Sequence, residues 1–272
     1  MKLIKITLFA TFFMAASVVS YAQLSDRQNN PGKFKIGTRP VAGNLGFMIG
    51  GSMSDFKTLI KGDSSKNTLP LLALKYYKSD SQVWRLGVKA TKNSTVRKGK
   101  IDTTGNYLMG LPTSVSKDSV TMTSEFLLYP GIEKHFLSSN IFDAYLAASL
   151  PLGFLREKQI NNEDIGNTTS DYSHHKMSKM SLIYGIEAFF GIQAFIADLP
   201  LALGLEMGVS GIGYRGEKYK HKDEESNLGV ATNQTYYTYK DDPMNAKYSS
   251  LKSNSYELKG SVRLTLSYYF AK

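Results

Sequence analysis

The sequence has no cysteine, one tryptophan and only four histidines among its 272 residues. Without cysteine the chain forms no disulfide and carries no lipid on an N-terminal cysteine, so hydrogen bonding and burial must hold the fold together. No run of about eighteen apolar residues follows the N-terminal region, which excludes a membrane-spanning helix there. If this part of the chain crosses a bilayer, it must do so as a closed β-barrel, because every backbone polar group inside the bilayer needs a hydrogen-bond partner.

The start of the chain has the pattern of a cleaved secretory signal peptide. Lys2 and Lys5 precede an apolar core, and small residues end it at Ala22, before Gln23. The formal net charge is +10, and loss of Lys2 and Lys5 would leave about +8. Export argues against nucleic acid as the partner of this basic chain and favours anionic lipid head groups.

Strict alternation marks the last strand, residues 256–270. One face is apolar apart from Gly260, and its other members are Tyr256, Leu258, Val262, Leu264, Leu266, Tyr268 and Phe270. The opposite face is polar, with Glu257, Lys259, Ser261, Arg263, Thr265 and Ser267. Such a length is unusual in a soluble protein, and aromatics at the ends of an apolar face are typical of a membrane-spanning strand.

Eight such segments are predicted along the chain: 40–51, 69–78, 82–91, 120–134, 142–155, 180–195, 201–214 and 256–270. Their connections alternate: 52–68, 92–119, 156–179 and 215–255 are long, whereas 79–81, 135–141 and 197–200 are short. Membrane barrels have short periplasmic turns and long extracellular loops, so this asymmetry favours a barrel. A soluble secreted β-sandwich is the alternative, because its strands alternate too.

Taken together, these features resemble the small outer-membrane β-barrel (porin-like) family of the outer-membrane protein X and A barrel type. The signal ending in Ala22 and Gln23 is similar to those of Bacteroidetes. The resemblance implies an all-β, eight-stranded antiparallel up-and-down transmembrane barrel in the cell outer membrane, inserted by the barrel-assembly machinery. That machinery would read the closing aromatics Tyr268 and Phe270, although this chain ends two residues later, at Lys272. The predicted divisions are a signal peptide, 1–22; a periplasmic N-terminal segment, 23–39; and the barrel, 40–272.

Inside an eight-stranded barrel there is room only for side chains. Alternation turns five bases inward, Lys75, Arg85, Lys89, Lys259 and Arg263, and six acids, Glu125, Glu133, Asp143, Glu187, Glu206 and Glu257. Buried charges must be paired, so we expect an ion-pair network that plugs the lumen. Distances along the strands predict that Arg263 meets Glu206, with Glu187 at a similar level.

The predicted loops contain the candidate contact residues. Arg97, Lys98 and Lys100 are candidate contacts for lipopolysaccharide phosphates. Tyr219, Tyr236, Tyr237 and Tyr239 form a candidate recognition surface for an outer-membrane protein partner, since tyrosine is suited to such contacts.

Little in the sequence points to chemistry. His174 and His175 lie near Ser173 and Ser178, and some small barrels are lipid A-modifying enzymes that use a histidine with a serine. The spacing matches neither enzyme of that kind, and no metal-ligand spacing is present. We therefore predict a non-enzymatic structural or interaction protein without a cofactor. The alternatives are an accessory subunit of an outer-membrane secretion or barrel-assembly machine, and a lipid A-modifying barrel enzyme.

Overall fold

The computed structural model describes residues 39–52, 55, 67–68, 70–102, 114–136, 139, 141–166, 171–196, 199–239 and 246–270. The predicted signal peptide, 1–22, lies outside these residues, as does all of the predicted periplasmic N-terminal segment, 23–39, except Arg39. Within the described residues, no helix is both long and apolar enough to cross a membrane. The strands are β1 (Leu45–Gly51), β2 (Asn67–Thr68), β3 (Leu71–Ser79), β4 (Gln82–Asp102), β5 (Ser114–His135), β6 (Phe142–Ser149), β7 (Leu152–Ile165), β8 (Tyr172–Phe195), β9 (Leu201–Arg215), β10 (Tyr219–Asn227), β11 (Val230–Thr238) and β12 (Asn254–Phe270).

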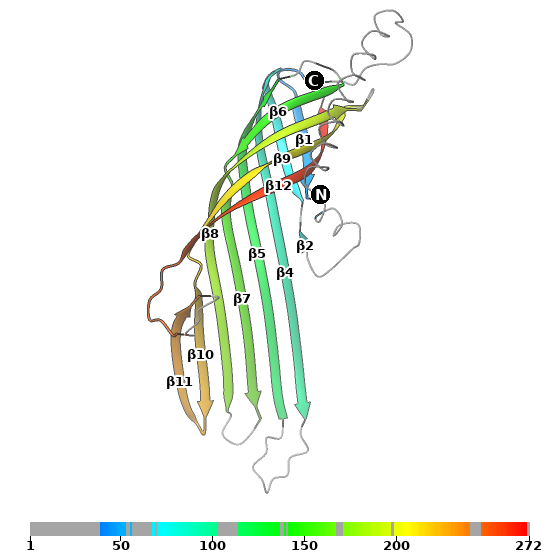
Figure 1. The fold of residues 1–272 in the computed structure, drawn as a ribbon. Coiled ribbons are helices and arrows are strands. Elements are labelled where there is room, and N and C mark those ends of the chain that lie inside the picture. Colours follow the sequence, from blue (N-terminus) through cyan, green and yellow to red (C-terminus); the bar gives the residue numbers. More distant parts are fainter. Residues whose placement is uncertain are drawn as a thin grey trace, which may run out of the picture. The chain divides into compact units, whose positions relative to one another are not determined.

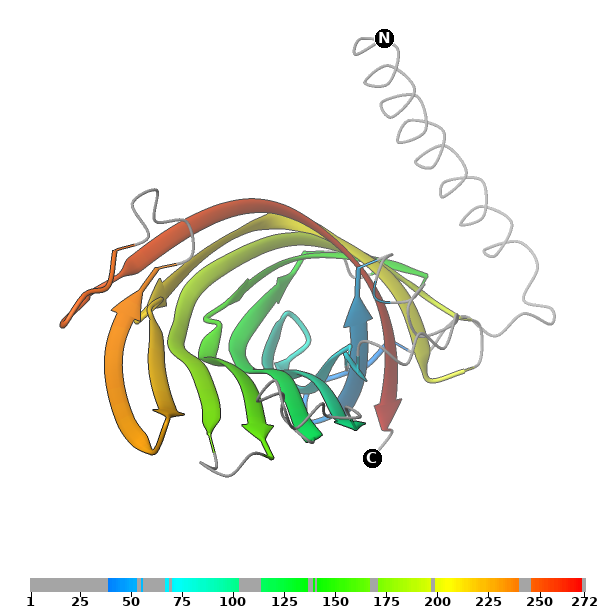
Figure 2. The same ribbon diagram turned by 90° about the horizontal axis from the view of Figure 1, so that it is seen from below.

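All the strands belong to one antiparallel sheet whose pairings return to their starting point. β1 pairs with β3, β3 with β4 and β4 with β5, and β5 pairs with both β6 and β7. β6 and β7 pair with β8, β8 with β9, β9 with β12, and β12 with β1. In Figure 2 the red C-terminal strand lies beside the blue strand near the start of the described chain. The all-β antiparallel prediction is confirmed, and the sheet closes on itself over part of its length.

The predicted strand over residues 142–155 is interrupted at Leu150 and Pro151, which separate β6 from β7. Proline has no backbone N–H and cannot donate to the ladder, so the break falls where the sequence demands it. The register with β8 is the same on both sides of the break: Ser149 pairs with Glu187, and Leu152 pairs with Tyr184. The break thus inserts no extra residue. β6 and β7 therefore occupy one position in the sheet.

The predicted long loops 92–119 and 156–179 are wrong over most of their length. β4 continues to Asp102 and β5 begins at Ser114, while β7 runs to Ile165 and β8 starts at Tyr172. Figure 1 shows these four strands running well past the end of β12. Their outer halves are largely polar on both faces, so the apolar alternation disappears although the hydrogen-bond ladder continues. We call this region the extension: residues 92–102, 114–124, 156–165, 172–179 and 219–238.

The predicted loop 215–255 is also wrong in its first half, which folds as the β10–β11 hairpin on the edge of β8. Leu228 and Gly229 form its turn with φ of 52° and 79°. Two positive φ angles match the twist of a tight hairpin, but a leucine rarely adopts one. The remaining unpredicted element is the two-residue strand β2, which pairs with β4.

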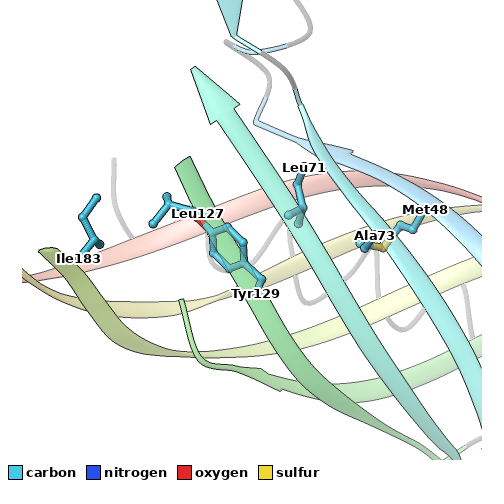
Figure 3. Close-up of a cluster of buried hydrophobic side chains, with 6 residues drawn as sticks. All are labelled: Met48, Leu71, Ala73, Leu127, Tyr129 and Ile183. Atoms are coloured by element: carbon cyan, nitrogen blue, oxygen red, sulfur yellow. The ribbon is translucent and has the colours of Figure 1, made fainter. Parts of the chain in front are cut away.

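The enclosed side of the sheet holds a hydrophobic cluster beside buried polar groups. Its members are Met48, Leu71, Ala73, Leu127, Tyr129 and Ile183, drawn in Figure 3. They come from β1, β3, β5 and β8, so the cluster joins strands that are distant in sequence. Among the glycines on this side, Gly191 allows Tyr145 to lie directly over it, since a Cβ there would be 2.3 Å from the tyrosine ring.

Candidate functional site

The two faces of the closed part of the sheet have opposite chemistry. On the enclosed face Lys75 and Glu206 are fully buried. On the outer face, the residues next to the buried Arg85 and Glu133 are apolar and exposed, with Trp84 at 54%, Leu86 at 50% and Ile132 at 60%. A water-soluble protein has the reverse arrangement, because burial of apolar side chains drives its folding. We call the exposed apolar side chains of the outer face the apolar belt.

Arg85 is the centre of a buried charge network on the enclosed face. Its Nη1 donates hydrogen bonds to Oε1 of Glu206 at 2.6 Å and to Oε1 of Glu133 at 3.1 Å. Lys75 Nζ lies 3.0 Å from the same Glu133 oxygen. The Tyr145 hydroxyl donates to Glu206 at 3.1 Å. These contacts join β3, β4, β5, β6 and β9 through fixed, oppositely charged groups.

The expected group of Arg263, Glu206 and Glu187 is present. Arg263 lies opposite Glu206 in the β9–β12 register, and its Nη1 donates to Glu206 Oε2 at 3.3 Å. Its Nη2 lies 3.5 Å from Glu187 Oε2. Glu187 also accepts hydrogen bonds at 3.1 Å from the hydroxyls of Ser149 and Ser210. The network thus extends to β8 and β12.

Sequence reasoning missed His135, which it placed in a turn. His135 is the last residue of β5 and is buried. Its Nδ1 lies 2.6 Å from Asp143 and its Nε2 lies 3.3 Å from Glu133. Arg39 Nη2 lies 3.7 Å from the same Asp143 oxygen. The signal was available, because His135 follows Glu133 by two residues and so shares its face of the strand.

Four predicted members of the network, Lys259, Glu257, Lys89 and Glu125, lie elsewhere. Lys259 is exposed and pairs with Glu257 at 2.7 Å, because β1 ends opposite Leu264 and leaves this part of β12 uncovered on that side. Lys89 and Glu125 are half-buried, and the described residues include no ion-pair partner for either. Both line a cavity of about 290 Å³ whose walls also include Arg263 and Glu187.

The closing aromatics Tyr268 and Phe270 belong to the apolar belt. They are 43% and 51% exposed, and their rings meet edge to face with centroids 5.0 Å apart. The sheet register places Tyr268 opposite Phe47 and Phe270 opposite Leu45 on β1. The C-terminal aromatics therefore lie where the last strand closes onto the first.

The predicted basic loop is part of a strand. Arg97, Lys98 and Lys100 are all exposed on β4. Alternation puts Arg97 on the enclosed side of the sheet, and Lys98 and Lys100 on the side that continues the apolar belt. Lys98 Nζ lies 3.7 Å from Asp118 on β5. The three residues therefore do not act as one surface cluster.

The four tyrosines of the predicted recognition loop are likewise divided between two faces. Tyr219 donates a hydrogen bond to Glu157 at 3.0 Å, and the Tyr236 ring stacks on His221 with centroids 4.7 Å apart. Tyr237 receives the ammonium of Lys218 over its ring at 4.7 Å, and Tyr239 stacks on Tyr248 at 5.7 Å. No single face presents all four.

His174 and His175 lie on opposite faces of β8. His174 Nε2 lies 2.7 Å from Asp164, whereas His175 Nδ1 contacts Asp223. Both imidazoles thus engage carboxylates rather than the neighbouring serines. The nearby His221 is partly buried, and burial, followed by the neighbouring His175, lowers its pKa below 6.5.

No family model and no curated protein matches this sequence. Among solved structures, a major outer membrane protein from Thermus thermophilus is similar with a TM-score of 0.33 and 15% identity, covering 84% of this chain and 98% of that chain. A likeness of this degree carries no inference about function.

Proposed function

We propose that this chain is an integral outer-membrane β-barrel protein. The inverted polarity of the closed sheet carries the proposal: the enclosed face holds buried ion pairs, whereas the apolar belt is exposed. Exposed apolar area of this extent is unfavourable in water and favourable in lipid. On β8 the outward apolar residues run from Met180 to Phe190, an interval of about 11 residues that matches a bilayer-spanning strand.

The barrel has eight strand positions in this proposal. The cycle of pairings passes through β1, β3, β4, β5, β6 with β7, β8, β9 and β12, while β2, β10 and β11 lie outside it. An eight-stranded barrel has an interior that side chains fill. The buried network supports a plugged, non-conducting barrel, and for this barrel we propose a structural or interaction role rather than an enzymatic one.

Lipopolysaccharide is the partner that the outer face supports best. Starting at the edge of the apolar belt, three successive rows of outward residues contain six bases and no acid: Lys92, Arg156, Lys158, Lys176, Lys220 and Lys222. Basic side chains at this level would meet phosphate groups at the membrane surface. Lys98 and Lys100 continue the same face, whereas Arg97 does not.

Trp84 provides the test, because it is the only tryptophan and belongs to the apolar belt. In vesicles containing brominated lipid, its fluorescence should be quenched at least twofold. The matched control is Trp84→Phe combined with Val230→Trp, which moves the tryptophan to the tip of the β10–β11 hairpin, beyond the apolar belt, and should abolish most of the quenching. Unquenched Trp84 fluorescence, or a protein that stays monomeric in buffer without detergent, would overturn the membrane assignment.

An accessory role in a secretion or barrel-assembly machine is the second candidate. The hairpin turn favours it, because Leu228 is 78% exposed at a φ of 52° and Val230 is 67% exposed, beyond the apolar belt. Exposed apolar groups at a strained turn suit contact with a protein. In-cell crosslinking from position 228 should then capture a defined outer-membrane protein. If the chain crosslinks to no other protein, the accessory role is refuted and the barrel acts alone. Lipid A modification gains no support, because His174 and His175 face opposite sides of β8.

A further inference from the structure

His175 and His221 face one another across neighbouring strands of the extension. Asp223 on β10 lies directly opposite His175 on β8, and His221 is two residues before Asp223 on the same face. The two ring centroids are 5.4 Å apart, and His175 Nε2 lies 3.5 Å from His221 Nδ1. Both rings lie outside the apolar belt, so the inference below is independent of the proposed membrane location.

The other nitrogen of each ring already has a partner. His175 Nδ1 contacts the Asp223 carboxylate, which only accepts hydrogen bonds when it is ionised, so Nδ1 carries the proton of the neutral ring. His221 Nε2 lies 2.9 Å from Thr238 Oγ1, which can accept a hydrogen bond from a protonated Nε2. With these assignments, His175 Nε2 and His221 Nδ1 carry no proton, and each directs its lone pair toward the other. Two facing lone pairs repel unless a cation lies between them.

We propose that His175 and His221 bind a divalent transition-metal ion of the zinc type. Zinc bonds to imidazole nitrogen at about 2.0–2.1 Å, so two ligands of a tetrahedral site lie about 3.3–3.4 Å apart, close to the observed separation. Imidazole is also a preferred ligand of copper and nickel. The contact of Asp223 with the outer nitrogen of His175 matches the carboxylate partner that orients most histidine ligands of metals.

The surroundings hold the pair in place but leave it accessible. The Tyr236 ring lies parallel to His221 with an interplanar angle of 1°. The His175 side chain is 37% exposed, which leaves room for water ligands. Among the residues that the structure describes, no group of three or more histidine, aspartate or glutamate side chains could hold a metal. The site therefore uses two side chains and water, and it should bind an exchangeable ion more weakly than a structural zinc site.

Calorimetric titration of zinc chloride into the full chain, refolded in detergent, tests the proposal. We expect one saturable site below about 100 μM free zinc, with affinity at least tenfold weaker in His175→Ala and in His221→Ala. Asp223→Asn should weaken binding by about 10-fold or more, the range seen for such supporting residues. His174→Ala is the matched control, since it removes the adjacent histidine from the opposite face, and it should change affinity less than twofold.

No saturable site in the unaltered chain, or equal binding by the His175→Ala and control variants, would overturn the proposal. Misfolding of a variant would appear as loss of its heat-modifiable band on a gel. In that case, electron paramagnetic resonance of the unaltered chain with one equivalent of Cu²⁺ tests whether both histidines bind the ion. Coupling to two imidazole nitrogens supports the pair, and coupling to one or none overturns it.

Discussion

Replacing Arg85 with methionine should be the most damaging single change in the buried network. Arg85 is almost fully buried and bonds to Glu206 at 2.6 Å and to Glu133 at 3.1 Å. Removing one partner of a buried ion pair typically costs about 3–5 kcal/mol, because the remaining charge stays desolvated. Glu133 keeps Lys75 at 3.0 Å and Glu206 keeps Arg263 at 3.3 Å, so we expect about 3 kcal/mol, the lower end of that range.

Urea unfolding in lipid vesicles, followed by the fluorescence of the single Trp84, would measure this loss. Arg97→Met is the matched control, because it makes the same replacement on the exposed part of β4 and should move the midpoint little. Adding Glu206→Gln to Arg85→Met should recover part of the loss, since it removes one of the stranded charges. An unchanged midpoint for Arg85→Met would refute the reasoning that these buried charges depend on one another.

The remaining predictions concern three other places. Arg263→Met should cost about 1–2 kcal/mol by the same unfolding measurement, because its contacts with Glu206 and Glu187 are longer and Glu206 keeps Arg85; a loss equal to that of Arg85→Met would contradict this. Gly191→Ala should lower stability by about 1–3 kcal/mol by overpacking against Tyr145, whereas Gly99→Ala, with open space at its Cβ, should have little effect. NMR titration should place the pKa of His221 below 6.5, owing to burial and to His175 and Lys247, with Asp223 opposing them. Since the unfolded state then binds more protons, the protection factors of the amides in the β10–β11 hairpin, corrected for the intrinsic pH dependence of exchange, should decrease as the pH falls below about 6.5. Protection factors that do not change with pH would contradict the assignment.

The sequence by itself determined the strands of the closed sheet and the face that each residue occupies. A period of two is a local property, so alternation alone assigns Arg85, Glu187, Glu206 and Arg263 to one face. Counting Glu206 from the turn at Pro200 and Arg263 back from Phe270 then placed the two residues at a similar height on neighbouring strands, and the β9–β12 register pairs them. The break at Pro151 was equally local, since it follows from one missing backbone N–H.

Only the tertiary structure decided where the strands end and what the polar stretches do. The extension is polar on both faces, so nothing in its pattern distinguishes it from a loop until neighbouring strands complete its hydrogen bonds. Lys259 alternates as Arg263 does, yet it is exposed, because β1 stops before reaching it. His175 and His221 are 46 residues apart and meet because β10 adds to the edge of β8. Such contacts depend on which strands become neighbours, a choice made by the packing of the whole sheet rather than by any segment of it.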